Sequence, residues 1–335
     1  MKRLKRVTVL GGGSWGTTVA SLVSANAATT LWIRNEEAAE QVNREHRNPR
    51  YLGELALHAG LRATASLQEA LSDCDVLVLG VPSHAMREIL RDCAPILRPW
   101  VPVISLAKGL EQGSHRRMTQ IINEELPGHP AGVLAGPNIA REVLQGMAAA
   151  AVIAMTDEQV GRALQPLFGS RVFRVYLNTD VIGCELGGPL KNVIAISAGM
   201  GDGLGVGHNT RSLVITRGLA EITRLGVALG GRAESFAGLT GLGDLLTTCM
   251  SPLSRNRQVG ERLAHGESIP QIVTSMHMVA EGIKTSTVVM ELAEKYQLKL
   301  PIAAEVSGVV KGERTVAQAF RGLRGIAPGS EHEAA

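Results

Sequence analysis

The chain has 335 residues, of which 45% are hydrophobic and 19% are charged, and its formal net charge is +3 at pH 7. This composition is typical of a globular protein, and the length suffices for about two domains. The small net charge and the 3% of aromatic residues argue against nucleic-acid binding, which uses basic grooves and stacking rings. The apolar stretch behind the basic N-terminus lasts about four residues, so we expect neither a signal peptide nor membrane insertion.

The spacing of metal-binding residue types predicts no metal site. Cys74, Cys93, Cys184 and Cys249 are far apart and form no C-x-x-C pair, which fits neither a zinc site nor a disulfide framework. The nine histidines are scattered. We therefore expect reduced thiols in a cytoplasmic protein.

Strand and helix patterns differ between the two halves of the chain. Up to about residue 178, short β-branched runs alternate with helical patterns, which predicts βαβ units and a parallel sheet with right-handed crossovers. From residue 183 onward, apolar residues recur at helical spacing. We predict an α/β domain over residues 1–180, an all-helical domain over 181–325 and a disordered tail over 326–335. The expected strands lie within residues 7–10, 29–34, 75–82, 101–109, 132–137, 148–155 and 171–177.

A glycine motif follows the first expected strand, in "RVTVLGGGSWGTTVASLV". Gly11, Gly13 and Gly16 have the spacing G-x-G-x-x-G, in which the first glycine permits a tight turn and the third lets helix and strand pack closely. The second glycine lets a pyrophosphate approach the backbone, where free amides at the helix start favour its charge. A tight turn without a ligand is the alternative, but the position in a βαβ unit favours a dinucleotide-binding domain.

The end of the second expected strand, "LWIRN", bears on the choice of dinucleotide. An NAD-specific site usually has an Asp or Glu here that binds the ribose hydroxyls. This chain has Arg34, whose planar cation suits a 2′-phosphate. We predict that NADP(H) is preferred and that NAD(H) is accepted; the alternative is a solvated arginine at a strand end.

Lys191 is the candidate for proton transfer. It follows Pro189 in "GGPLKNVIAIS", and proline is common at the first position of a helix. We therefore expect Lys191 in a first helical turn, where the helix dipole lowers the pKa of an ammonium group. A lysine tuned in this way can exchange a proton with a hydroxyl or carbonyl group near neutral pH. The alternative is an ordinary surface lysine.

Two further polar segments lie in the helical half. Asp244 follows three glycines in "GLTGLGDLL", and such a carboxylate can accept substrate hydroxyls or hold an ammonium group. In "SPLSRNR", Ser254, Arg255 and Asn256 read as a helix start, where amides and an arginine can bind a phosphate. A turn aspartate and a plain serine cap remain the alternatives.

Taken together, these motifs resemble one family, the bacterial-type NAD(P)-dependent sn-glycerol-3-phosphate dehydrogenases. The resemblance extends from "GGGSWGT" to "VAEG" and includes "VPSHAMR", "SLAKGLE", "AGPNIAREV", "ELGGPLKNVIAISAGM", "NTRSLVITRGLAE" and "SPLSRNRQVG". It implies an α/β Rossmann-type N-terminal domain and an all-α C-terminal domain like that of 6-phosphogluconate dehydrogenase. It also implies NADP(H)- or NAD(H)-dependent reduction of dihydroxyacetone phosphate to sn-glycerol 3-phosphate for phospholipid synthesis.

The resemblance implies roles for individual residues. Lys191 is the implied proton donor in the reduction and acceptor in the oxidation, with Lys108 facing the substrate and Asp244 orienting both substrate and Lys191. The implied substrate-binding residues are Lys108, Gly136, Asn138, Lys191, Asp244, Ser254, Arg255 and Asn256. The implied cofactor-binding residues are Gly11, Gly13, Ser14, Trp15, Gly16, Arg34, Lys108, Ala140, Arg255, Val279 and Glu281.

The loop "AGPNIA" departs from the family pattern. The family has Ser or Thr followed by Phe or a similar residue, where this chain has Asn138 and Ile139. A carboxamide can donate or accept in place of a hydroxyl, so we expect an altered geometry and retained activity.

Two other functions remain open from the sequence. A β-hydroxyacid or 6-phosphogluconate dehydrogenase relative would also carry a lysine on the first helix of its second domain, although "SPLSRNR" and "GLTGLGD" favour a triose phosphate. A cofactor-sensing protein without turnover would need no pairing of Lys191 with Asp244. The sequence does not determine the oligomeric state, for which a homodimer is one expectation.

Overall fold

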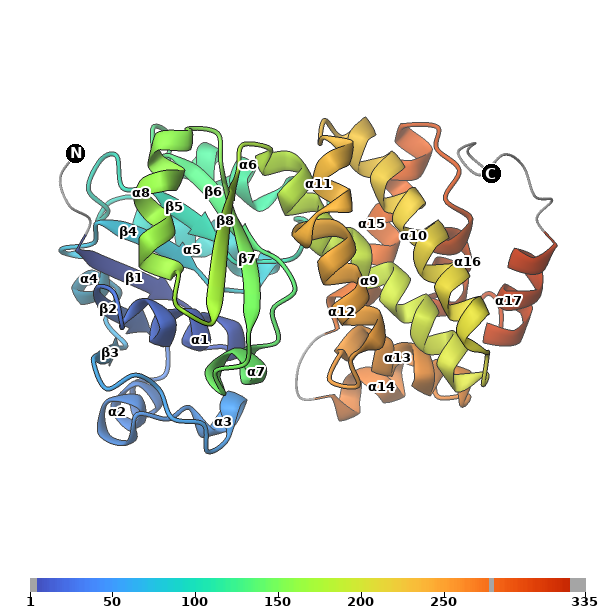
Figure 1. Ribbon diagram of the computed structural model, residues 1–335, viewed down its shortest axis with the longest axis horizontal. Helices are drawn as coiled ribbons and strands as arrows, with labels where there is room; N and C mark the ends of the chain where they lie inside the picture. Colours follow the sequence, from blue (N-terminus) through green and yellow to red (C-terminus); the bar gives the residue numbers. More distant parts are fainter. Residues whose placement is uncertain (1–4, 277–279, 326–335) are drawn as a thin grey trace. The chain divides into compact units, whose positions relative to one another are not determined.

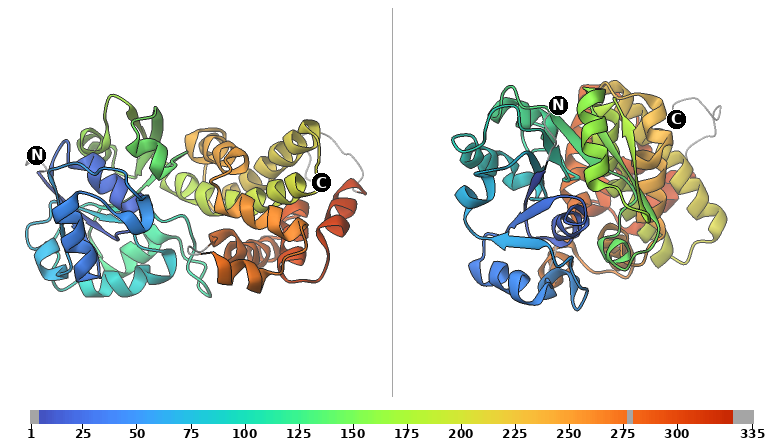
Figure 2. Two further views of the ribbon diagram at one scale, coloured as in Figure 1. Left: turned by 90° about the horizontal axis from the view of Figure 1, so that it is seen from below. Right: turned by 60° about the vertical axis from the view of Figure 1, so that its left-hand side comes forward.

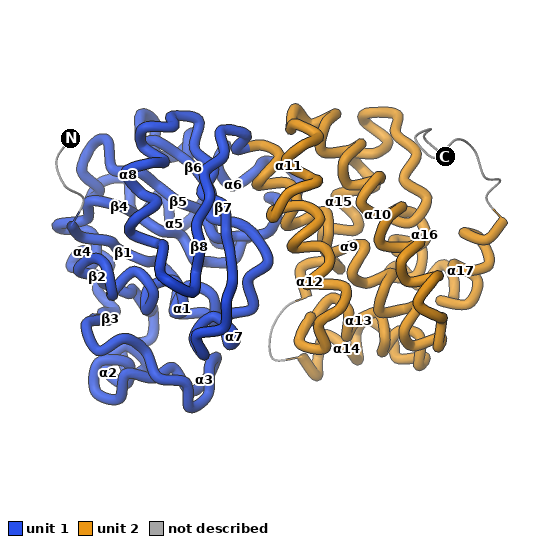
Figure 3. Tube along the Cα trace, viewed as in Figure 1, with its two compact units in different colours: residues 1–181 blue, residues 182–335 orange. Residues whose placement is uncertain are grey.

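The computed structural model describes residues 5–276 and 280–325. It divides into two compact units, unit 1 (Met1–Val181) and unit 2 (Ile182–Ala335), which Figure 3 colours separately. Among the described residues, no helix is both long enough and apolar enough to cross a membrane.

Unit 1 contains an eight-stranded sheet with the strand order β3-β2-β1-β4-β5-β6-β7-β8. All neighbouring strands are parallel except β6 and β7, which are antiparallel, so the prediction of a parallel sheet holds apart from this pair. The connection between these two strands, residues 136–148, contains one short helix, α7. The strands are β1 (Arg6–Leu10), β2 (Ala28–Trp32), β3 (Leu61–Thr64), β4 (Val76–Leu79), β5 (Val103–Ser105), β6 (Ala131–Ala135), β7 (Ala149–Met155) and β8 (Phe173–Asn178).

Helices cover both faces of this sheet (Figures 1 and 2). Successive strand side chains point to opposite faces: in β4, Val76 and Val78 join one hydrophobic cluster, while Leu77 and Leu79 join the other. Burial on both faces explains why this strand is a continuous apolar run. The first cluster packs against α1 (Ser14–Val23), α2 (Glu36–Glu45), α3 (Pro49–Leu52), α7 (Ala140–Leu144) and α8 (Glu158–Phe168), and the second against α4 (Leu67–Leu71), α5 (Met86–Cys93) and α6 (Met118–Glu125).

Every secondary-structure element among the described residues of unit 2 is a helix, which confirms the predicted all-α half. Its central helix, α9 (Val181–Gly203), is buried on all sides from residue 183 to residue 200. The other helices are α10 (His208–Ala228), α11 (Ala233–Ala237), α12 (Asp244–Met250), α13 (Arg255–Ala264), α14 (Ile269–Ser275), α15 (Glu281–Lys295), α16 (Pro301–Val310) and α17 (Val316–Arg324), with a π-helical turn at Leu239–Gly243 before α12.

The start of α9 corrects the predicted position of Lys191. The sequence suggested that the helix begins at Pro189, but it begins at Val181 and Pro189 lies inside it. A proline inside a helix costs about 3 kcal/mol, which the burial of the surrounding turns outweighs. Lys191 therefore lies near the middle of α9, and the argument from the dipole at a helix end does not apply to it.

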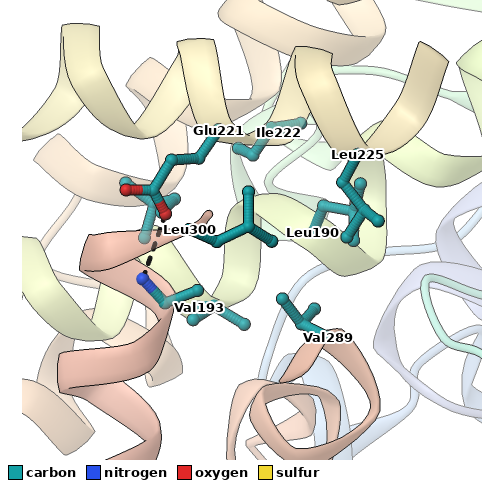
Figure 4. Close-up of a pocket in the computed structure, with 9 residues that line it drawn as sticks. Leu190, Val193, Glu221, Ile222, Leu225, Val289 and Leu300 are labelled. Carbon is teal, nitrogen blue, oxygen red and sulfur yellow. Dashed lines mark hydrogen bonds between the residues drawn. The ribbon is translucent and has the colours of Figure 1, made fainter. Parts of the chain in front are cut away.

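Unit 2 also contains a small cavity of about 10 Å³, room for about one water molecule, between α9, α10, α15 and α16 (Figure 4). Glu221 on α10 is the charged residue of its lining. The carboxylate accepts hydrogen bonds from the backbone N–H groups of Ile302 (2.7 Å) and Ala303 (3.1 Å), at the start of α16. Burial raises the pKa of Glu221 to about 7, although these N–H groups and two arginines on α10 partly oppose the shift.

Candidate active site

The glycine turn after β1 is shaped by close backbone contacts. Gly11 has φ +118°, and a Cβ there would lie 2.7 Å from the carbonyl carbon of Gly80. A Cβ at Gly16 would overlap the carbonyl oxygen of Gly11. Neither position accepts a side chain, because β1, the loop after β4 and α1 meet at this turn.

Gly13 differs from its neighbours, since a Cβ there would meet no described atom within 4 Å. It is the N-cap of α1, and no side chain in the described part of the chain caps the amides of the first turn, which starts at Ser14. Free amides at a helix start beside open space form an anion site, so this turn fits a pyrophosphate. The ring of Trp15, which is partly buried, packs on that of Phe173 with 6.3 Å between the ring centroids.

Two residues that the sequence reasoning missed support the turn. Asn48 is buried, and its NH2 group donates to the carbonyl of Gly12 and to the hydroxyl of Thr17, both at 2.9 Å. Gly80 allows the close packing against Gly16. Gly80 could have been recognised from the sequence, because it directly follows the apolar run of β4. Asn48 lies too far along the chain from the glycine turn to be recognised from local spacing.

Arg34 lies just beyond β2, and its side chain is exposed. The N–H of Gly11 donates to the carbonyl of Trp32, which holds the end of β2 beside the glycine turn. The following helix α2 is capped by Asn35, which accepts from the N–H of Ala38. The position of Arg34 next to the turn is compatible with binding of a ribose 2′-phosphate.

The loops after β5 and β6 bring together Lys108 and the segment 136–140. The ammonium group of Lys108 donates to the carbonyl oxygen of Gly136 at 3.1 Å. The NH2 group of Asn138 donates to the carbonyl of Ala150 at 3.0 Å, and its Oδ1 is buried without a hydrogen-bond partner among the described residues. Ala140 is the first residue of α7. The predicted contact residues of these two loops therefore lie together.

A buried ion pair forms the most distinctive feature of unit 2. The Nζ of Lys191 lies 2.6 Å from Oδ1 of Asp244, and the two residues are only 4% and 2% exposed. Asp244 is the first residue of α12, so the pair joins this helix to α9. A buried ammonium group needs such a partner, because desolvation of an unpaired charge is very costly.

Thr248 completes this group and was missed from the sequence. Its hydroxyl accepts a hydrogen bond from Nζ of Lys191 and donates to the backbone carbonyl of Asp244 at 2.7 Å. The sequence could have indicated it, because residues four apart lie on one face of a helix and Thr248 follows Asp244 at that spacing. The ammonium group is thus held in place by one carboxylate and one hydroxyl oxygen.

The predicted helix start at residues 254–256 is confirmed. Ser254 is the N-cap of α13 and accepts from the N–H of Arg257. Asn256 is buried, and its Oδ1 accepts from the N–H of Gly282 on α15 at 3.0 Å, which leaves its NH2 group as the part that could bind a phosphate.

Arg255 and Glu281 begin neighbouring helices, α13 and α15. The residue Arg255 is exposed overall. The pKa of its guanidinium is nevertheless lowered by desolvation, and the charge of Glu281 only partly opposes this shift. Arg255 stays charged at physiological pH and can bind an anion. Val279, a predicted cofactor contact, and residues 326–335, the predicted disordered tail, lie outside the described residues.

The two units carry complementary chemistry. Unit 1 has a strand-turn-helix anion site of the kind that binds dinucleotides, and unit 2 has a buried ammonium group that could exchange a proton with an alcohol or ketone. Among the described residues, no group of three or more His, Cys, Asp or Glu could hold a metal ion. The fold and these groups define the class of dinucleotide-dependent dehydrogenases that combine a Rossmann-type unit with a helical one.

Comparison with known proteins defines the family. Residues 6–161 match the family model described as the NAD-dependent glycerol-3-phosphate dehydrogenase N-terminus, and residues 180–321 match the model of its C-terminus. The chain belongs to the NAD-dependent glycerol-3-phosphate dehydrogenase family.

Individual relatives agree along nearly the whole chain. A protein of Sphingopyxis alaskensis named glycerol-3-phosphate dehydrogenase (NAD(P)+) 2 is 58% identical, covering 98% of each chain. A glycerol-3-phosphate dehydrogenase (NAD(P)+) of Mycobacterium avium is 56% identical over 98% of this chain and 97% of its own. The crystal structure of glycerol-3-phosphate dehydrogenase from Coxiella burnetii is 32% identical, with a TM-score of 0.91 over 96% of this chain and 99% of that one.

Proposed function

We propose that the protein catalyses the reversible NAD(P)H-dependent reduction of dihydroxyacetone phosphate to sn-glycerol 3-phosphate, which supplies the backbone of glycerophospholipids. Family membership and the names of its relatives support this activity. The observation that carries the proposal is the buried pair of Lys191 and Asp244. A protein that only sensed a cofactor would have no use for an ammonium group held in this way.

In this proposal Lys191 is the proton donor. Reduction of the ketone places negative charge on the C2 oxygen, and the ammonium group of Lys191 stabilises that charge and gives up one proton to form the hydroxyl. Asp244 and Thr248 hold Nζ in one position, since the carboxylate of Asp244 and the hydroxyl of Thr248 both accept hydrogen bonds from it. In the oxidation direction, Lys191 in its neutral form takes the proton from the alcohol.

The substrate phosphate is assigned to residues at helix starts. Ser254, Arg255 and Asn256 contribute amides, a guanidinium group and an NH2 group, all donors to a phosphate dianion. A bound phosphate restricts the orientation of the ketone, which lowers the entropic cost of reaching the transition state. Lys108, Gly136 and Asn138 are the proposed substrate contacts of unit 1.

The cofactor is assigned to unit 1, with further contacts from unit 2. Open space at Gly13 and the uncapped start of α1 support pyrophosphate binding there, with Arg34 on the 2′-phosphate of NADP(H) and NAD(H) also accepted. The bound nicotinamide supplies the hydride that C2 receives. The remaining proposed contacts are Gly11, Ser14, Trp15, Gly16, Lys108, Ala140, Arg255, Val279 and Glu281.

The remaining expectations concern organisation and location. Residues 1–180 form the dinucleotide-binding domain and residues 181–325 the catalytic domain in this proposal. A cytoplasmic homodimer is the expected form, and size-exclusion chromatography with light scattering tests the dimer.

One absorbance assay tests substrate and cofactor together. Oxidation of NADPH and of NADH is followed at 340 nm with dihydroxyacetone phosphate, and we expect turnover with both and a higher kcat/KM for NADPH. A panel of β-hydroxyacids and 6-phosphogluconate, assayed with the oxidised cofactors, serves as the control. Turnover with the panel alone would favour the other dehydrogenase class, and cofactor binding without any turnover would favour a sensing protein.

A further inference from the structure

Arg87 is the centre of an ion-pair cluster in unit 1 that none of the roles above uses. Its guanidinium group forms a bidentate salt bridge with Glu111, through two hydrogen bonds of 2.7 and 2.8 Å. It also reaches Glu125 at 2.5 Å and Glu124 at 2.8 Å. The side chains of Arg87 and Glu111 are only 25% and 21% exposed, so this is not a fully solvated surface pair.

The cluster connects three segments of the chain. Arg87 comes from α5, Glu124 and Glu125 come from α6, and Glu111 comes from the hairpin that we define as residues 108–117. This Lys108 hairpin is closed by a β-bridge between Leu110 and Arg117 and by a hydrogen bond from the N–H of Glu111 to the carbonyl of Arg116 at 2.9 Å. The pair of Arg87 with Glu111 joins the hairpin to α5, and the pair of Arg116 with Glu124, at 3.1 Å, joins it to α6.

The bidentate geometry of the Arg87–Glu111 pair requires an arginine. Two parallel N–H donors of a planar guanidinium fit one carboxylate and fix its orientation, whereas an ammonium group offers a single point of charge. The other two carboxylates hold the same guanidinium from the α6 side. Hydrogen bonds from Arg87 lower the pKa of Glu111 to about 2 against the opposing effect of desolvation, so Glu111 is ionised near neutral pH.

Lys108 lies three residues before Glu111, at the start of the same hairpin. It lies outside any helix or strand, since β5 ends at Ser105. Its ammonium group, which donates to the carbonyl of Gly136, can hold that direction only while the hairpin is fixed relative to the sheet.

We propose that Arg87 is a positioning residue for Lys108: by clamping Glu111 to α5 and α6, it fixes the hairpin that presents the Lys108 ammonium group to the substrate. This inference rests on the proposed function, in which Lys108 contacts dihydroxyacetone phosphate. It assigns Arg87 no contact with substrate or cofactor.

The first test measures the clamp without using activity. Hydrogen exchange of the amides of residues 109–117 is compared in the wild-type protein, Arg87→Ala and the matched control Arg91→Ala. Arg91 lies one turn further along α5 in the same cluster, but it pairs with Glu125 and its side chain is 64% exposed. We expect exchange in the hairpin to become about tenfold faster in Arg87→Ala and to stay unchanged in Arg91→Ala.

The second test links the clamp to Lys108 through a double-mutant cycle. In the wild-type background, we expect Arg87→Ala to raise the KM for dihydroxyacetone phosphate about tenfold with less change in kcat. In the Lys108→Ala background, the same substitution should raise this KM less than about twofold. Glu111→Gln, which leaves the α5–α6 pairs intact, should reproduce this effect, and Arg87→Lys should restore only part of it.

The outcomes separate this inference from the proposed function. Unchanged hairpin exchange in Arg87→Ala, or effects of Arg87→Ala and Lys108→Ala that multiply in the double variant, would overturn the positioning role. A wild-type protein that does not turn over dihydroxyacetone phosphate would contradict the proposed function instead, and the exchange measurement would still decide whether the clamp exists.

Discussion

Lys108 and Lys191, the two lysines assigned to the substrate, are held in opposite ways. Lys191 projects from a buried helix, is 4% exposed and has a carboxylate partner, Asp244, on a second helix. Lys108 projects from a loop, is partly exposed and donates to a backbone carbonyl, that of Gly136.

The difference follows from the cost of burying charge. A fully buried ammonium group needs an opposite charge and further hydrogen bonds, because neither water nor a single dipole compensates for its desolvation. A partly hydrated ammonium group is satisfied by a neutral oxygen, so the position of Lys108 depends on the loop that carries it. The helical unit therefore fixes its lysine through electrostatic pairing, and the α/β unit fixes its lysine through the clamped hairpin.

The largest expected effect is on the buried lysine. Lys191→Met removes the proposed proton donor and its charge, so we expect kcat to fall by about three to four orders of magnitude while NADPH still binds. Stopped-flow turnover and quenching of NADPH fluorescence measure the two properties. Lys311→Met, at an exposed position after α16, is the control and should leave both unchanged. Turnover of Lys191→Met within tenfold of wild type would remove Lys191 from the proposed chemistry.

The pairing itself is broken by Asp244→Asn. This variant leaves Lys191 buried without its countercharge, so we expect the free energy of unfolding to fall by about 3 kcal/mol and activity to fall as well. The double variant Lys191→Met/Asp244→Leu should recover most of the stability without recovering activity, because an apolar pair needs no charge compensation. Urea unfolding of the three proteins measures this. Equal stability of Asp244→Asn and wild type would show that the ion pair is not needed to keep Lys191 buried.

Glu221 extends the comparison, because it is a buried carboxylate satisfied by backbone N–H groups instead of a lysine. Its pKa is raised from 4.5 to about 7 in the folded state, so the folded state binds the proton more tightly than the unfolded state does. The resulting stability is fully present below pH 4.5 and is lost as the pH rises through about 7, a change of up to about 3 kcal/mol.

Urea unfolding of wild type and Glu221→Gln between pH 4.5 and 8 tests this dependence. We expect the wild-type free energy of unfolding to fall over this range and the slope to be much smaller in Glu221→Gln, which cannot ionise. Other groups titrate in both proteins, so the difference between the two slopes is the quantity to compare. Parallel slopes would mean that Glu221 keeps an ordinary pKa.

The smallest expected effect is at the exposed cation of the α/β unit. Arg34→Ala should raise the KM for NADPH about tenfold and leave the KM for NADH nearly unchanged, because only NADPH carries the 2′-phosphate. Steady-state kinetics with both cofactors measure this, and Arg50→Ala is an exposed control on α3. Equal effects on both cofactors would indicate that Arg34 contacts a group the two cofactors share.

Short sequence patterns were enough to predict features that depend only on residues close together in the chain. The glycine turn at residues 11–16, the serine cap at Ser254 and the apolar run of β4 follow from backbone freedom, capping chemistry and burial on both faces. The short strand Leu61–Thr64 was missed: its residues alternate between apolar and polar, but four residues are too few to distinguish a strand from a loop. The antiparallel β6–β7 pair was missed because strand direction depends on the path of the connection rather than on the strand residues.

By itself the sequence determined the division into a strand-rich and a helical half, the strand-turn-helix site for an anion and the residue types available for chemistry, because hydrophobic period and glycine spacing act over a few residues. Only the tertiary structure decided that Pro189 lies inside a helix, that Thr248 joins Lys191 and Asp244, and that Arg87 holds Glu111. These outcomes depend on which segments pack together, since burial outweighs the local cost of a proline and brings charges from distant parts of the chain within hydrogen-bond distance.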